Sequence, residues 1–498
     1  MTNIIFGPPG TGKTWTLLEE VENFIKQGVD PSKIGFFTFS RNATQEVHDR
    51  MYSKFQLTKK ELPHFRTLHS LGFTQLGYSR EKVMKDAHYK EIGKTCGIEL
   101  TYAIWDEDNG GVFSSDSPFL SLIELAKARN ITTEQQFNLD EHNQDLDITT
   151  LKRLEKEILN YKRDRGTVDW NDMINEFVKS KLCPKLKVAF IDEAQDLSIM
   201  QWKVVEKIRD NCEILYIAGD DDQCIYKWRG ADVTSFLNFP GDRRTLQQSY
   251  RVPKKIFDVA NKIISRIPNN KRVKKNWTPT EDEGSVDYHY DLEEIDISKG
   301  KWLILARDRW KLDEYEAYFK DNNIYFERKG FEDRYKEKYK SIDLWENKLK
   351  KGEPLTFEEC HTIKKKMTNE SWENKMFKAM VKDGLYDINT LKNKYGLKTE
   401  APWQSAFTRM GESDTKKITE LLNRGEDLKN GARIKLSTVH GVKGNERDNV
   451  VLSLSLTKTT FESYEKNPDD EHRTMYTGVT RSKKSLHIIY PNKRGYDL

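Results

Sequence analysis

The chain of 498 residues is poor in the features that mark secreted, membrane-spanning or fibrous proteins. It has only five cysteines, and no two of them have the CxxC spacing, so we expect neither a disulfide framework nor a zinc site. A reducing compartment fits this cysteine usage best. No run approaches the roughly 18 apolar residues of a membrane span, and we expect no signal peptide. With 14 prolines and 28 glycines, a linker-dominated or fibrous chain is excluded.

The chain also lacks a large charge of either sign. Its 83 basic and 79 acidic residues leave a net charge of +4, so net charge alone does not predict nucleic-acid binding, and any basic path must be local. Charged residues make up 33%, hydrophobic residues 36% and aromatic residues 11% of the chain, and the mean hydropathy is −0.79. This mixture is typical of a soluble globular protein with a charged surface and argues against disorder.

Short apolar runs alternate with helix-like segments along the chain. Apolar runs of this length between helices predict parallel strands that are buried on both faces. The expected strands are residues 3–6, 34–39, 187–192, 214–220, 302–306, 434–440, 450–455 and 486–490. The first helix follows Lys13, where Leu17, Leu18, Val21 and Phe24 begin one apolar stripe that Ile25 completes. The pattern predicts an α/β protein.

The expected strands fall into two groups, and each group is interrupted by a helix-rich, charge-rich stretch. We therefore predict two α/β core domains with parallel sheets, each carrying a mainly helical insertion. The first core comprises 1–78 and 166–245 with the insertion 79–165, and the second comprises 246–325 and 430–498 with the insertion 326–430.

A phosphate-binding loop follows the first expected strand. Residues 7–14 (GPPGTGKT) match G-x-x-x-x-G-K-[ST] and open a helix, which is the context that supports the motif. The residues expected to cradle phosphate are Gly7, Pro8, Gly10, Thr11, Gly12, Lys13 and Thr14. Lys13 should reach the β- and γ-phosphates, and the Thr14 hydroxyl should hold Mg²⁺. The loop alone indicates a nucleoside triphosphate and leaves a kinase, a AAA-type ATPase and a translocase open.

Two acids end the strand at 187–192. Asp192 can complete the Mg²⁺ shell, and Glu193 can orient or deprotonate the attacking water. An acidic helix N-cap after a strand is the alternative, which the phosphate loop makes the weaker interpretation.

Residues 218–231 (AGDDDQCIYKWRGA) form a longer and more specific motif that begins in the expected strand at 214–220. Together with 192–195 (DEAQ), this segment resembles the UvrD/Rep family of superfamily 1A DNA helicases. Further matches follow in the family's order at 37–43, 67–70, 168–173, 246–251, 436–446 and 475–481. The resemblance implies two RecA-like domains with ATP bound between them.

The resemblance also implies roles for single residues. Arg251 and Arg481 match arginines that reach the γ-phosphate, where guanidinium groups stabilise the charge on the transferred phosphoryl group. Gln223 matches the glutamine that senses the γ-phosphate. Tyr250 matches the residue that stacks on adenine, and Glu446 matches a residue near the ribose.

For nucleic acid, the resemblance implies aromatic platforms beside a phosphate–sugar track, because stacking on a base tolerates any sequence. Phe39, Tyr226 and Trp228 match the stacking positions. The residues matched to the track are Arg229, Thr67, His69, Thr438 and His440. Core packing is the alternative for Phe39, which ends an apolar strand, whereas Trp228 lies between two basic residues. The basic run 271–277 (KRVKKNW) could grip phosphates or form a solvated loop.

Two departures from the family bear on function. Only six residues precede Gly7, so we expect the family's upstream glutamine motif that reads adenine to be missing, which leaves the triphosphate open. Residues 490–496 lie where the family's strand-separating hairpin begins, and we expect that hairpin to be abbreviated and no fused nuclease to follow. This compact form resembles phage-encoded members.

We therefore expect an ATP- and Mg²⁺-dependent helicase that translocates on single-stranded DNA, 3′→5′ by resemblance, and unwinds duplex. One rival is an ATP-driven translocase that removes bound proteins and unwinds weakly; another is a nucleotide-gated DNA-binding module. The expected partners are single-stranded DNA, duplex junctions and replication or repair proteins, with no membrane and a monomer as the working assumption. The expected location is the cytoplasm, nucleoid-associated when on DNA, or the host cytoplasm if the protein is viral.

Overall fold

The computed structural model describes residues 1–498 except 107–111, 116, 141–145, 329–333 and 443–444. Two residues of the 436–446 motif, Lys443 and Gly444, therefore lie outside the described residues. The chain forms two compact units. The first comprises residues 1–290, 439–446 and 452–498, and the second comprises 291–438 and 447–451.

A six-stranded sheet forms the centre of the first unit. Its order is β3-β2-β6-β7-β1-β8, and every neighbouring pair is parallel. The strands are β1 (Thr2–Phe6), β2 (Ile34–Thr38), β3 (Phe65–Thr67), β6 (Leu186–Ile191), β7 (Cys212–Gly219) and β8 (Asp242–Thr245). Because the strands are parallel, the chain after β1, β6 and β7 emerges at one edge of the sheet, where ligands of open α/β sheets bind.

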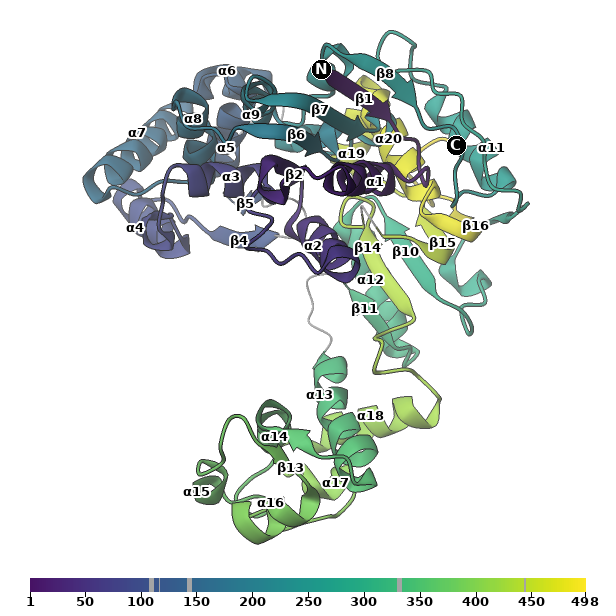
Figure 1. The fold of residues 1–498 in the computed structure, drawn as a ribbon. Coiled ribbons are helices and arrows are strands. Elements are labelled where there is room, and N and C mark those ends of the chain that lie inside the picture. Colours follow the sequence, from purple (N-terminus) through teal and green to yellow (C-terminus); the bar gives the residue numbers. More distant parts are fainter. Residues whose placement is uncertain (107–111, 116, 141–145, 329–333, 443–444) are drawn as a thin grey trace. The chain divides into compact units, whose positions relative to one another are not determined.

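Helices cover both faces of this sheet (Figure 1). On one face, α1 (Lys13–Lys26) and α2 (Arg41–Phe55) pack on residues such as Phe36 and Phe190. The stripe expected on the first helix is confirmed, since Leu17, Leu18 and Val21 are buried. On the other face lie α3 (Leu68–Gln75), α8 (Trp170–Lys179), α9 (Ile199–Arg209) and α10 (Val233–Asn238).

A largely helical segment interrupts this arrangement between α3 and α8. It contains α4 (Asp86–Cys96), α5 (Pro118–Arg129), α6 (Thr133–Leu139) and α7 (Ile148–Arg165), with strands β4 (Tyr102–Asp106) and β5 (Val112–Ser115). Buried residues of α4, α5 and α7 form a separate apolar core. In Figure 1 these helices lie together on one side of the first unit, next to α8 and α9.

The second sheet also has six strands, in the order β11-β14-β10-β15-β16-β9. The strands are β9 (Ser285–His289), β10 (Trp302–Ala306), β11 (Phe326–Arg328), β14 (Ile434–Thr438), β15 (Arg447–Ser453) and β16 (Ser482–Ile489). The β10–β14, β11–β14 and β9–β16 pairs are parallel. Strands β9 and β16 belong to the first unit, together with the helices α11 (Lys254–Ile264), α19 (Lys458–Lys466) and α20 (Pro468–Val479).

The second unit combines β10, β11, β14 and α12 (Arg309–Asp321) with a helical body. Its helices are α13 (Arg334–Ile342), α14 (Phe357–Lys364), α15 (Asn374–Phe377), α16 (Ile388–Tyr395), α17 (Trp403–Ala406) and α18 (Glu412–Asn423), with the short strands β12 (Leu355–Thr356) and β13 (Leu385–Tyr386). This body has its own apolar core, built around the buried indoles of Trp345, Trp372 and Trp403.

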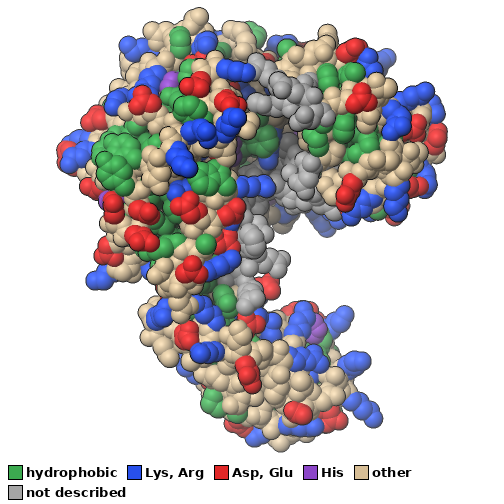
Figure 2. Space-filling view, turned by 180° about the vertical axis from the view of Figure 1, so that it is seen from behind, with side chains coloured by type: hydrophobic (Ala, Val, Ile, Leu, Met, Phe, Trp, Pro, Cys, Tyr) green, Lys and Arg blue, Asp and Glu red, His purple; other side chains and the backbone are tan. Residues whose placement is uncertain are grey.

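The expected α/β class is confirmed, because each of the eight runs expected to be strands overlaps a strand. Sequence did not indicate the edge strands β3, β8, β9 and β11. No disulfide joins any of the five cysteines, all of which lie in the described part of the chain. None of the helices that the structure describes is long and apolar enough to cross a membrane. On the face shown in Figure 2, basic and acidic side chains are interspersed, as the small net charge leads us to expect.

Candidate functional site

The phosphate loop joins β1 to α1 and folds tightly on itself. The Gly7 N–H donates to Gly219 O at 2.9 Å, and Lys13 Nζ donates to Gly7 O at 2.8 Å. A Cβ on Gly7 would lie 2.0 Å from Lys13 Cγ, so no other residue fits there. Gly12 caps α1 with φ 80° and no side-chain cap, which leaves the N–H groups of the first helical turn available to an anion.

Asp192 and Glu193 follow β6 and face the start of α1. Thr14 Oγ1 donates to Asp192 Oδ2 at 2.6 Å, and the Glu193 N–H donates to Asp192 Oδ1 at 2.9 Å. Burial and the neighbouring Glu193 raise the pKa of Asp192 to about 6. Glu193 has φ 53°, a left-handed conformation that costs roughly 1–2 kcal/mol in a non-glycine residue. Such strain is characteristic of functional positions.

Thr14 and Asp192 fit a magnesium ion that bridges the protein and a triphosphate. Mg²⁺ in nucleotide sites is held by one or two protein oxygens, water and phosphate oxygens. The hydroxyl and the carboxylate already lie 2.6 Å apart, and a cation would offset the cost of ionising the buried Asp192. The described residues contain no group of three or more His, Cys, Asp and Glu able to hold a metal ion by themselves.

The raised pKa of Asp192 makes a prediction about stability. A carboxyl whose folded pKa is about 6 instead of 3.8 stabilises the fold below pH 3.8 relative to higher pH, and this contribution is lost as pH rises through 6. Asp192→Asn should therefore gain in melting temperature relative to the wild type between pH 4 and pH 6, and no further above that. A melting-temperature difference that stays constant across this range would contradict the assignment.

A chain of hydrogen bonds runs from the carboxylate pair to the last expected arginine. Gln195 Nε2 donates to Glu193 Oε2 at 2.6 Å, and Gln195 Oε1 accepts from the Asp220 N–H at 2.9 Å. Gln223 Nε2 donates to Asp220 Oδ2 at 2.7 Å, and Gln223 Oε1 accepts from Arg481 Nη2 at 2.5 Å. Burial, together with the nearby Arg251, lowers the pKa of Arg481 to about 10. Arg481 is thus bonded directly to Gln223 and, through Asp220 and Gln195, is linked to Glu193.

Residues 249–251 lie against the phosphate loop. The Tyr250 N–H donates to Gly10 O at 2.9 Å, and a Cβ on Gly10 would lie 2.4 Å from Arg251 Cβ. Ser249 Oγ donates to Pro9 O at 2.8 Å, a contact that sequence reasoning missed. The Tyr250 ring is 78% exposed and so is available for stacking.

Arg251 is paired with Glu446. Its Nη2 lies 2.8 Å from Glu446 Oε2, and Lys483 Nζ lies 3.4 Å from the other carboxylate oxygen. Burial lowers the pKa of Arg251, while Glu446 and Glu193 oppose this shift. Arg251 and Arg481 therefore both lie within the electrostatic reach of Glu193, beside the loop that carries Lys13.

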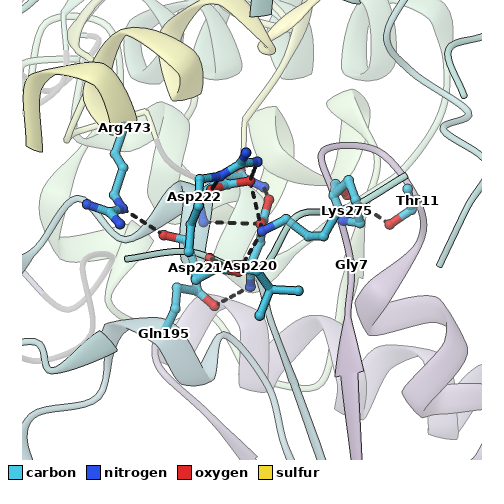
Figure 3. A network of polar contacts seen from close by, with 12 residues as sticks. Gly7, Thr11, Gln195, Asp220, Asp221, Asp222, Lys275 and Arg473 are labelled. Carbon is cyan, nitrogen blue, oxygen red and sulfur yellow. Dashed lines mark hydrogen bonds and ion pairs between the residues drawn. The ribbon is translucent and has the colours of Figure 1, made fainter. Parts of the chain in front are cut away.

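Three consecutive aspartates after β7 form a buried ionic network, which we call the Asp220–222 cluster. Lys275 Nζ lies 2.9, 2.5 and 2.8 Å from carboxylate oxygens of Asp220, Asp221 and Asp222, and Figure 3 shows it reaching between them. Arg272 pairs with both oxygens of Asp222 at 2.7 and 2.6 Å. These carboxylates raise the pKa of Lys275 well above its ordinary value against the effect of burial.

The network corrects our interpretation of the basic run 271–277. Arg272 and Lys275 neither grip phosphates nor form a solvated loop, because both are paired within the Asp220–222 cluster. Arg473, which is 1% exposed, adds a hydrogen bond from Nε to Asp221 O at 3.0 Å. Sequence reasoning missed Arg473, whose role became visible only because the structure buries almost all of its helix.

Lys275→Met should destabilise the first unit strongly. The substitution removes the ammonium that faces three buried carboxylates, and breaking a buried ion pair on one side costs roughly 3–5 kcal/mol. Lys274→Met is the matched control, since Lys274 is exposed and should change stability by less than about 0.5 kcal/mol. Urea unfolding of both variants checks this, and equal midpoints for them would contradict the role of the network.

Aromatic side chains gather where β2 and the 218–231 segment end. Phe39 stacks on Tyr226 at 5.8 Å and 22°, and Tyr226 Oη donates to His440 O at 2.7 Å. Trp228 is 54% exposed, with the Arg229 guanidinium 4.4 Å from its ring centroid. Tyr226 is only 2% exposed, so in this arrangement it supports Phe39 and His440, and Trp228 offers the open ring.

Thr67 and His69 lie one strand away from Phe39. Thr67 pairs in register with Thr38 and caps α3 by accepting from the Ser70 N–H at 3.2 Å. The His69 ring meets Trp170 edge-on at 6.1 Å, and desolvation lowers the pKa of His69 to about 4, so it is neutral at pH 7. Thr438 ends β14 in the second unit.

A parallel sheet, a glycine-rich loop that opens a helix, and an adjacent Thr–Asp pair define a P-loop nucleotide-binding protein. Comparison with known sequence families narrows this class. The UvrD/REP helicase N-terminal domain matches residues 1–244, and the UvrD-like helicase C-terminal domain matches residues 330–493. The chain belongs to the UvrD/Rep-like family of superfamily 1A helicases, whose members have two RecA-like domains.

Three relatives illustrate the similarity. The ATP-dependent DNA helicase PcrA of Bacillus subtilis is 24% identical over 308 residues, which are 57% of this chain and 40% of the relative. The ATP-dependent DNA helicase Rep of Buchnera aphidicola is 25% identical over 282 residues, 53% of this chain and 40% of the relative. PcrA of Staphylococcus aureus is 24% identical over 312 residues, 59% of this chain and 42% of the relative. The chain thus spans about two fifths of the length of these relatives.

Proposed function

We propose that this protein is an ATP-dependent DNA helicase that translocates on single-stranded DNA in the 3′→5′ direction and unwinds duplex. One observation carries the proposal. Gln223 is hydrogen-bonded to Arg481 on one side and to Asp220 on the other, and the chain continues through Gln195 to Glu193. Three of the residues that would act on the γ-phosphate, Glu193, Gln223 and Arg481, thus belong to a single hydrogen-bonded chain.

In the proposed reaction, Lys13 and the loop N–H groups bind the phosphates, and Thr14 and Asp192 hold Mg²⁺. The magnesium ion would neutralise charge on the β- and γ-phosphates. Glu193 orients the attacking water and accepts its proton. Arg251 and Arg481 stabilise the charge on the transferred phosphoryl group. Tyr250 stacks on the base, for which we propose adenine, and Glu446 holds Arg251 until the triphosphate arrives.

Only a few residues separate the proposed γ-phosphate site from the proposed DNA-binding residues. Gln223 lies three residues before Tyr226, whose hydroxyl binds the His440 carbonyl and whose ring supports Phe39. A change in the contacts of Gln223 when the γ-phosphate is lost would therefore reach Tyr226, Trp228 and Arg229 through one short segment. We propose that this segment alternately tightens and releases its grip on stacked bases, while Thr67, His69 and Thr438 contact the phosphate–sugar track.

We also propose the domain division 1–78 with 166–245 and 246–325 with 430–498 for the two cores, and 79–165 and 326–430 for the insertions. The proposed partners are single-stranded DNA, duplex junctions and proteins of replication or repair, with the protein acting as a monomer in the cytoplasm.

ATP hydrolysis measured with and without single-stranded DNA tests the motor directly. We expect strong stimulation by the strand and a requirement for Mg²⁺. Comparing the unwinding of a forked duplex with the displacement of a DNA-bound protein separates the helicase from the rival translocase that only removes proteins. The relatives carry the name helicase, which favours unwinding. A rate of ATP hydrolysis that does not change when single-stranded DNA is added would contradict the proposal.

Trp228→Ala should weaken the stimulation of hydrolysis by single-stranded DNA and leave basal hydrolysis nearly unchanged. Loss of one stacked base costs about 1–3 kcal/mol, so the DNA concentration for half-maximal stimulation should rise roughly 5- to 150-fold. Trp310→Ala is the control, because Trp310 is also exposed, at 44%, but lies on α12. A parallel fall of basal and stimulated rates would indicate that Trp228 serves packing instead.

A further inference from the structure

A groove of about 720 Å³ lies in the first unit. Its walls come from residues 247–248, from α11, from the segment 269–278 and from Tyr476 on α20. None of the residues that line it belongs to the loop at 7–14 or to the carboxylate pair. A volume of this size lies within the range of roughly 300–1,000 Å³ that small-molecule sites occupy.

The lining is polar and contains no acidic side chain. Four amides and one ammonium on it have no hydrogen bond or ion pair with the described residues; they belong to Gln247, Asn261, Asn269, Asn276 and Lys274. The other two cations, Arg272 and Lys275, face the carboxylates of the Asp220–222 cluster and are already paired. Lys274 is therefore the cation on this lining that can meet an anionic ligand.

Tyr476 supplies a second and independent observation. Its side chain is fully buried, it lines the groove, and its hydroxyl has no hydrogen-bond partner among the described residues. Buried hydroxyls are almost always paired, and leaving one unpaired costs about 1–3 kcal/mol. Burial and the nearby Asp220 and Asp222 keep the pKa of Tyr476 far above its ordinary value, so the group is a permanent donor. A ligand oxygen that reached the hydroxyl from the groove would satisfy it.

We propose that this groove binds one nucleotide unit, a base with its sugar phosphate, as a site separate from the phosphate loop. Each part of a nucleotide has a counterpart in the lining. The ammonium of Lys274 suits a phosphate, and the amides suit base edges, which present adjacent donors and acceptors. Phe257 and Trp277, packed edge-on at 4.7 Å, provide apolar surface for a base, and the Tyr476 hydroxyl donates to a base or sugar oxygen.

The same chemistry could come from a free nucleotide or from one nucleotide of a strand. The experiment therefore uses two probes, AMP and a photoreactive dT oligonucleotide, with the phosphate loop saturated by a non-hydrolysable ATP analogue. Equilibrium dialysis counts AMP bound per chain, and the cross-linked peptide locates the oligonucleotide. Because no hydrolysis is measured, the result does not depend on the proposed motor.

Two variants make the test specific. Tyr476→Phe removes one hydroxyl that has no partner in the described protein, and Lys274→Glu reverses the available charge; neither variant should melt below the wild type. We expect each to weaken binding at this groove at least 10-fold, and Lys255→Glu, an exposed control on α11 outside the lining, to leave it unchanged.

One equivalent of AMP that is lost in both variants would identify a free nucleotide as the ligand. Cross-links within 247–278 that are lost in both variants, without AMP binding, would identify a strand. Absence of both signals, or signals that both variants retain, would overturn the proposal.

Discussion

Glu193→Gln is expected to abolish turnover while the protein still binds ATP. General-base catalysis contributes roughly 10²–10⁴-fold, so kcat for ATP should fall by that factor. Binding should persist because the amide keeps the shape of the carboxyl and can still accept the hydrogen bond from Gln195 that Glu193 accepts at 2.6 Å. Glutamine also has the same side-chain length as glutamate, so the left-handed backbone conformation at residue 193 should be kept and the local fold should survive. Steady-state hydrolysis and binding of a fluorescent ATP analogue measure the two quantities separately.

The charges around Glu193 indicate how the substitution should affect ATP affinity. The Glu193 charge acts on both Arg251 and Arg481 and opposes the lowering of their pKa values by burial. Removing it leaves more uncompensated positive charge near the phosphate loop, so ATP should bind as tightly as before or more tightly. Glu213→Gln, on an exposed acid of β7 that pairs with Lys187, is the control and should change neither quantity. An unchanged kcat in Glu193→Gln would refute the assigned base.

The sequence predicted those parts of the site whose chemistry depends on residues that are close together along the chain. The phosphate loop needs glycines and a lysine at fixed spacing because backbone N–H groups and one ammonium must meet one anion. Asp192 and Glu193 end an apolar strand, so their place at the sheet edge followed from the pattern. The structure brings Thr14 to Asp192 as this argument requires.

Other parts depend on residues far apart in the chain and could not be predicted. Lys275 and the Asp220–222 cluster are about fifty positions apart, so the run around Lys275 looked like a free basic patch, although its charge is matched in space. For Tyr226 the sequence suggested an exposed side chain, whereas the structure buries it. Its motif suggests an open stacking ring, yet the His440 carbonyl and the Phe39 ring cover it. Periodicity describes one element at a time and carries no information on such pairings.

Arg481→Lys should lower kcat by a factor on the order of 10³ with a smaller effect on ATP affinity. An arginine that stabilises the transferred phosphoryl group contributes about 10³–10⁵-fold. Lysine keeps the charge but not the planar fork, which here donates from Nη2 to Gln223 at 2.5 Å and from Nε to the Thr477 carbonyl at 3.0 Å. Because Arg481 is 2% exposed, a lysine ammonium there could not find water in place of the lost acceptors. Single-turnover hydrolysis separates the chemical step from binding.

A double-mutant cycle with Gln223→Asn tests whether Arg481 acts through Gln223. The shorter amide cannot span the distance between Asp220 and Arg481 that Gln223 bridges with bonds of 2.7 and 2.5 Å. If the two residues position one another, the second substitution should cost little once the first has been made, because contacting residues are not additive. Losses that multiply would show that Gln223 and Arg481 contribute independently, and the route from the γ-phosphate to Tyr226 would then have to begin elsewhere. Melting temperatures close to that of the wild type are required of both single variants, since a partly unfolded first unit would lower both rates and imitate non-additivity.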